Sequence, residues 1–212
     1  MNNDKKYDLI FNSLLNGTVE DWEHLTQQFP DFPDGLDGAE LTKEAEDDFR
    51  QRYPDIYNLK NELLQQYPDL SSSIADHWLN IAIDCAPLKC VRWMISKGVN
   101  LHYNSPGGYF PLHCCIDREF PDKYEMLQLL IDNGADINIG TEVGTMADNG
   151  WSPLHMAAAR NDLEAIKILL DNGADPTLKT IIDSYCTAEQ EATILGKHEA
   201  AELIRTYKPK KK

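Results

Sequence analysis

Apolar side chains recur at intervals of three and four residues along most of this chain. Such spacing places them on one face of a helix. The clearest stripe consists of Leu163, Ile166, Leu169 and Leu170. Further helices are expected over residues 10–16, 19–28, 39–52 and 55–67. The pattern therefore predicts a series of short amphipathic helices.

Three segments, residues 78–100, 111–136 and 153–175, repeat one order of residue types. Each has a Leu near its start and a Gly near its end. The separation is 19 positions from Leu79 to Gly98, 22 from Leu112 to Gly134 and 19 from Leu154 to Gly173. Self-similarity at a nearly fixed period indicates a stack of repeated units.

The third segment resembles an ankyrin repeat at nearly every signature position. It reads Ser-Pro-Leu-His-Met-Ala-Ala over residues 152–158 and Leu-Leu-Asp-Asn-Gly-Ala-Asp over residues 169–175. The resemblance covers residues 75–206 and extends to residues 7–30 as an N-terminal cap. It implies an all-α fold, an ankyrin-repeat solenoid of stacked helix-turn-helix units with short finger loops.

The signature residues have physical roles in such a unit. Ser152 is suited to cap a helix that begins at Pro153, where the missing N–H has no partner to lose. Asn161 stands between the two helices, where the family usually has Gly, and Asn tolerates a left-handed conformation. Gly173 is expected to end the second helix in that conformation. Small residues at Ala157 and Ala158 allow neighbouring helix pairs to pack closely.

Successive copies can be counted from the turn between the two helices. This turn falls at Ala86, Asp122, Asn161 and Gly196, in steps of 36, 39 and 35 residues. Each step is a repeat of about 33 residues with a short addition. The additions are assigned to residues 118–121, inside one helix pair, and to residues 139–149, in a finger loop.

The last copy, residues 187–204, carries Glu189 and Gln190 where the resemblance implies Leu and His. Polar replacements suit a terminal repeat, because no further unit covers its outer face.

The chain is therefore divided into four parts. Residues 1–35 are expected to form an N-terminal capping helix pair, residues 75–206 the repeats with a C-terminal cap, and residues 207–212 a basic tail. Residues 36–74 are acidic, and Pro54 and Pro68 close their two expected helices. Two interpretations of this part stay open: a degenerate repeat, or a helical insertion that packs beside the stack.

The net charge of the chain restricts the kinds of molecule that it is expected to bind. The 212 residues carry 20 Lys and Arg against 35 Asp and Glu, a net charge of −15. Eleven of the acids lie between Glu20 and Asp48, with Lys43 as the one base there, so this stretch alone carries −10. Phosphate backbones and anionic lipids would be repelled, so we expect no nucleic-acid or membrane binding and a partner protein with a basic surface.

The sequence also bears on the compartment. No uninterrupted apolar segment resembles a secretory signal or reaches the ~20 residues of a membrane helix. Five cysteines, two of them adjacent at Cys114 and Cys115, suit neither a disulfide framework nor a paired metal motif. A cytoplasmic location is expected.

No constellation for catalysis is found, and neither a cofactor nor a metal is expected. His113 and His155 occupy equivalent repeat positions, where the resemblance implies that they hydrogen-bond the turns of their own and adjacent repeats. Cys114 and Cys115 adjoin His113, but residues one position apart point about 100° apart on a helix. The glycine-bearing loops lack phosphate-binding spacing, and the acidic residues lack that of an EF-hand.

Candidate binding residues come from the exposed positions of the fingers and first helices, which form the concave binding surface in ankyrin proteins. Tyr109 and Trp151 immediately precede the helix caps, and Tyr103 lies in a finger. Exposed Trp and Tyr dominate interface energetics, although Trp151 folding under the loop 139–149 is the alternative. The full predicted set is Tyr103, Tyr109, Trp151, Asp117, Arg118, Phe120 and Arg160, with Glu44, Asp47 and Asp48 as an acidic docking patch.

The predicted function is a non-enzymatic protein–protein interaction module. It binds a macromolecular partner through the concave face, while the acidic N-terminal third steers the partner's basic surface toward it. The alternative is an inhibitor or immunity-type protein that neutralises a basic enzyme such as a nuclease toxin.

Overall fold

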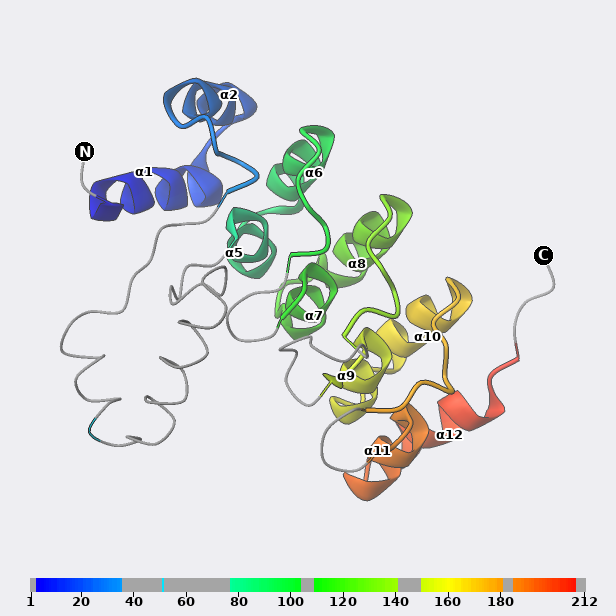
Figure 1. Ribbon diagram of the computed structural model, residues 1–212. Coiled ribbons are helices and arrows are strands. Elements are labelled where there is room, and N and C mark those ends of the chain that lie inside the picture. The colour runs from blue at the N-terminus through cyan, green and yellow to red at the C-terminus, as the bar shows by residue number, and fades with distance from the viewer. Residues whose placement is uncertain are drawn as a thin grey trace.

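A computed structural model describes residues 3–35, 51, 77–103, 109–140, 150–180 and 185–208. These residues form ten helices arranged as five antiparallel pairs, and an isolated β-bridge joins Lys179 and Thr187. The pairs stack in chain order, with the first helices in one row and the second helices in another (Figure 1). The predicted all-α solenoid is confirmed.

The helix pairs have the following bounds: α1 Asn3–Asn16 and α2 Val19–Gln28; α5 Trp78–Cys85 and α6 Leu88–Ser96; α7 Pro111–Asp117 and α8 Lys123–Asp132; α9 Pro153–Ala159 and α10 Leu163–Asp171; α11 Ala188–Ile194 and α12 His198–Thr206. We refer to α1, α5, α7, α9 and α11 as the first-helix row.

The helix ends in the pair α9 and α10 agree with the sequence prediction. Ser152 Oγ accepts from the backbone N–H of His155, and Pro153 is the first helical residue. Asn161 has a φ of 55° in the turn between the helices, and Gly173 has a φ of 96° after α10. Local sequence therefore sets both ends of this unit.

Two helix N-termini depart from the capping pattern of the third segment and are capped by other residues. Phe110 precedes α7 but offers no side-chain acceptor, so the helix keeps only half of the capping arrangement: the backbone N–H of Phe110 donates to His113 Nδ1 (3.4 Å). In the last pair, Gln190 replaces the usual His, and its Oε1 accepts from the N–H of Thr187 (2.9 Å). The capping geometry thus tolerates a change of residue type.

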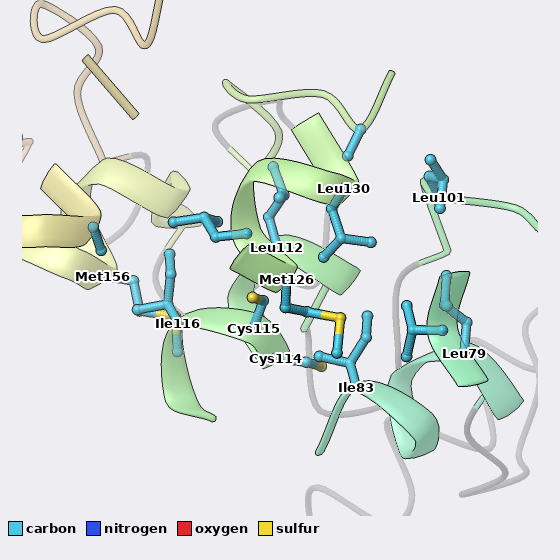
Figure 2. Close-up of a cluster of buried hydrophobic side chains, with 14 of the residues drawn as sticks. Leu79, Ile83, Leu101, Leu112, Cys114, Cys115, Ile116, Met126, Leu130 and Met156 are labelled. Carbon is cyan, nitrogen blue, oxygen red and sulfur yellow. The ribbon is translucent and has the colours of Figure 1, made fainter. Parts of the chain in front are cut away.

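The core runs through the stack between the two rows of helices. Figure 2 shows its central part, where side chains of α5, α7, α8 and α9 meet. Cys115 is fully buried, like Ala157, which has the same position in the third segment. All five cysteines are free thiols, and burial raises the pKa of Cys115 to about 12. Cys115 is therefore a packing residue and not a nucleophile.

The N-terminal helix pair packs directly on α5 and α6. The rings of Trp22 and Trp93 lie 5.5 Å apart, those of Phe32 and Trp93 5.8 Å apart, and those of Tyr7 and Trp78 5.6 Å apart. Direct contact makes the two pairs neighbouring layers of the stack.

The predicted segment 36–74 lies outside the described residues except for Gln51. The choice between a degenerate repeat and a helical insertion concerns those residues and stays a prediction.

We expect Trp22→Ala to be strongly destabilising. The side chain is fully buried, and its Nε1 donates to Ser13 O (2.8 Å). Truncation of a buried Trp costs ~3 to 5 kcal/mol, which should appear in urea unfolding followed by circular dichroism. Leu9→Ala is the control, because Leu9 is 41% exposed on α1 and should change the free energy of unfolding little. Equal effects of the two variants would contradict the cap packing described here.

Candidate partner-binding face

A ladder of side-chain hydrogen bonds joins each repeat to the finger of the next. His113 Nδ1 accepts from its own cap, so the ring proton is on Nε2, which donates to Trp151 O (3.0 Å). His155 repeats the arrangement: Nδ1 accepts from the N–H of Ser152 (3.3 Å), and Nε2 donates to Cys186 O (3.0 Å). The predicted structural role of these two histidines is confirmed.

Asn80 makes the same connection one repeat earlier. Its Nδ2 donates to Tyr109 O (3.4 Å). The three accepting carbonyls belong to Tyr109, Trp151 and Cys186, each of which immediately precedes a helix cap. The ladder therefore fixes the backbone at the finger positions whose side chains vary between repeats.

A carboxylate extends this connection to the N-terminal layer. His77 caps α5 by accepting from the N–H of Leu79 at Nδ1 (3.2 Å), while its Nε2 donates to Asp34 Oδ1 (3.0 Å). The same oxygen of Asp34 accepts from the N–H of Asn100 (2.6 Å). Asp34 thus holds the end of the N-terminal segment to the next helix pair.

Burial keeps the ladder histidines neutral. Desolvation lowers the pKa of His113 to about 4, although the hydrogen bond to Trp151 opposes this shift. Desolvation also lowers the pKa of His155 and that of His77. A neutral ring is required, because Nδ1 must accept a hydrogen bond while Nε2 donates one.

The three predicted finger aromatics are half-buried. The Tyr103 ring lies 4.9 Å from that of His77, and Tyr109 and Trp151 pack partly against the core. A Cβ on Gly140 would lie 2.3 Å from Trp151 O, and Gly140 has a φ of 101°. Glycine is therefore needed where the start of the long finger loop meets Trp151.

A family model described as ankyrin repeats in three copies matches residues 79–180 and 139–211. This chain belongs to the ankyrin repeat family. A search of curated proteins finds no match. Ankyrin repeats generally mediate protein–protein interaction and are typically non-enzymatic.

Asp117 and Arg160 form an ion pair between neighbouring ankyrin repeats. Arg160 Nη2 donates to Asp117 Oδ2 (2.8 Å), Nε contacts Oδ1, and both side chains are about one-third exposed. The pair lies at the C-terminal ends of α7 and α9. The finger aromatics lie at the N-terminal ends, about 10 Å away for helices of seven residues. The predicted residues therefore border the first-helix row from two sides.

Arg118 is wrongly included in the predicted binding set. Its guanidinium is buried and donates to the carbonyls of Ile83 and Ala86, the latter at 2.8 Å from Nη2. These carbonyls are at the end of α5, where no helical N–H is available to bond them. Arg118 is a cap for the preceding repeat, so a partner cannot reach its charge.

Asp122 completes this contact with the preceding repeat. Its carboxylate accepts from Arg118 Nε (2.8 Å) and from the N–H of Leu88 at the start of α6 (3.3 Å). The hydrogen bond from Arg118 lowers the pKa of Asp122. The two side chains together form hydrogen bonds at both ends of the turn between α5 and α6. Ala86 and Pro87 in this turn do not adopt a left-handed conformation.

The inserted Phe120 is 46% exposed, and its ring stacks on the Arg118 guanidinium, with Cζ 4.3 Å from the ring centroid. Tyr185, which is 67% exposed in the finger before the last pair, is absent from the predicted set. It stands two positions before the cap residue Thr187, whereas Tyr109 and Trp151 stand one position before their caps, so the spacing used for the prediction does not select it.

Several acids of the N-terminal segment already have intramolecular partners. Glu23 accepts from Trp93 Nε1 (2.9 Å) and pairs with Lys97 (2.5 Å), and Asp31 pairs with Lys6 (2.9 Å). Asp21 caps α2 through Thr18. Glu44, Asp47 and Asp48 lie outside the described residues. Among the described residues of this segment, these carboxylates therefore help to hold the N-terminal layer together.

Within the part of the chain that the structure describes, no three His, Cys, Asp or Glu side chains are grouped so as to hold a metal ion. In the same residues, no helix combines the length and apolar character needed to cross a bilayer.

We expect the ladder to make stability depend on pH. The pKa of His113 is lower in the folded chain (about 4) than in the unfolded chain (~6.5). The unfolded state therefore binds more protons in this range. The His113 contribution is complete above pH ~6.5 and is lost as the pH falls to ~4, a change of up to ~3 kcal/mol. Urea unfolding between pH 7 and 4.5 measures this slope.

His113→Gln should reduce the slope, since Gln does not titrate. The control is His102→Gln, because the His102 side chain is exposed and outside the ladder. A slope that His113→Gln leaves unchanged would show that other groups cause the pH dependence.

Proposed function

We propose that the chain binds a partner protein through the concave face of the stack, formed by the fingers and the first-helix row. The observation that carries this proposal is the ladder. It fixes the backbone of Tyr109 and Trp151 at successive fingers, so ordering these side chains on binding costs little further entropy. Tyr185 extends the row to the last finger.

Charge supports a further part of the proposal, that the acidic N-terminal third accelerates association with a basic surface. Of its eleven acids, Asp21, Glu23, Asp31 and Asp34 have intramolecular contacts. We assign the steering to the acidic docking patch of Glu44, Asp47 and Asp48, because it lies within the stretch that carries −10.

The second candidate is an inhibitor or immunity-type role, in which the acidic segment covers the anion-binding cleft of a basic enzyme. The charge of −10 between Glu20 and Asp48 favours it. Loss of the partner's catalytic activity in the complex would distinguish this role from a simple binding module.

A pull-down with the full chain, followed by titration calorimetry with the recovered partner, tests the concave face. We expect Trp151→Ala and Tyr185→Ala each to weaken binding by ~10-fold or more, as for aromatic anchors at interface centres. Lys167→Ala is the matched control, because Lys167 is exposed on α10, in the second-helix row. Binding of equal strength by all three variants would refute the proposed face.

Ionic strength tests the steering. The association rate with that partner should fall ~10-fold or more between 50 and 300 mM NaCl, while dissociation changes little. The triple variant Glu44→Gln, Asp47→Asn, Asp48→Asn should reduce this salt dependence. Its control is Glu164→Gln with Glu202→Gln, which removes charge from α10 and α12, in the second-helix row. An association rate indifferent to salt would contradict steering.

A further inference from the structure

The insertion between α7 and α8 presents an apolar side chain that the fold holds in place without burying it. Phe120 is 46% exposed, yet one face of its ring rests on Arg118, with Cζ 4.3 Å from the ring centroid. Arg118 is itself immobilised by Ala86 O and by Asp122. Pro121 follows and restricts the backbone of Phe120. The ring is thus preorganised for contact on its outer face.

A second aromatic is held on the same edge of the stack. Tyr124 is 39% exposed, and its hydroxyl donates to Asp162 Oδ1 of the next repeat (3.1 Å). The backbone N–H of Lys123 donates to Phe120 O (3.1 Å), which closes a turn between the two aromatic residues. Both rings therefore keep apolar surface in solvent while their positions are fixed.

The charges of this edge favour a basic partner. Each nearby base is already paired: Arg118 with Asp122, Lys123 with Asp162, and Arg160 with Asp117. Glu119 is exposed next to Phe120, and its carboxylate has no hydrogen bond or ion pair with any residue that the structure describes. An incoming Lys or Arg finds a carboxylate available to it, whereas an incoming acid finds only bases already paired.

We propose that Glu119, Phe120 and Tyr124 form a second protein-binding site, the turn-edge site. It takes a peptide segment of a partner in which an apolar side chain adjoins Lys or Arg. The apolar group packs on the outer face of Phe120, and the base pairs with Glu119. The site lies at the end of the first helices opposite the finger aromatics, about 10 Å away. Variants of the finger aromatics and of the turn-edge site therefore test the two proposals separately.

The test uses the full chain, labelled with nitrogen-15, and three short probe peptides. Acetyl-GKLKG-amide carries both features, acetyl-GELEG-amide reverses the charge, and acetyl-GKSKG-amide removes the apolar group. We expect acetyl-GKLKG-amide to shift the amide resonances of residues 118–125 saturably, with a Kd in the millimolar range (~1–10 mM). The other two peptides should bind at least ~5-fold more weakly.

Phe120→Ala should weaken binding of acetyl-GKLKG-amide at least ~5-fold, and Trp151→Ala should leave it unchanged. Phe120→Ala also removes the stack on Arg118, so Glu119→Lys provides an independent test at an exposed residue outside the packing. It should abolish the preference for the basic peptide. Shifts absent at ~10 mM peptide, shifts outside residues 118–125, or equal binding by the acidic peptide would each overturn the turn-edge site.

Discussion

The hydrogen bond from a first-helix side chain to the carbonyl of the next finger is the contact on which the rest of this structure depends. Asn80, His113 and His155 each make it, and each joins two residues that are 29 to 38 positions apart in the chain. A helix pair of this size cannot bury its apolar face alone, so stability comes from the interfaces between neighbours. The ladder sets the spacing of those interfaces and, with it, the spacing of the finger side chains.

The N-terminal layer and the insertion show how the stack accommodates departures from the repeat. Asp34 and the aromatic contacts of Trp22 and Trp93 couple the first helix pair to the second. The turn between α5 and α6 lacks a left-handed residue. Arg118 and Asp122 of the next repeat form hydrogen bonds with its backbone groups. Backbone groups that have no partner within an irregular turn are thus hydrogen-bonded by side chains of the neighbouring layer. The sequence of the turn can therefore vary.

The family, the repeat helices and the caps of the third segment could be predicted from the sequence, because each depends on residues within a few positions. Ser152, Asn161 and Gly173 act on their own backbone or on that of close neighbours. The surroundings of the candidate site residues were less predictable. Arg118 in an inserted segment suggests an exposed charge, whereas contacts with α5, more than 30 residues away, bury it. The half-burial of Trp151 likewise depends on its packing against the core, while His113, 38 residues earlier, bonds its carbonyl.

The sequence by itself determined the repeat, its period and the excess of negative charge, because these are properties of residue order and composition. Tertiary structure alone decided which charges have intramolecular partners. Glu23 and Asp31 belong to the acidic stretch, yet Lys97 and Lys6, distant in sequence, neutralise them within the stack. Pairing depends on distances between layers, which only the folded stack specifies. Tertiary packing likewise leaves Phe120 exposed and ordered, since the layer beneath holds the arginine on which its ring rests.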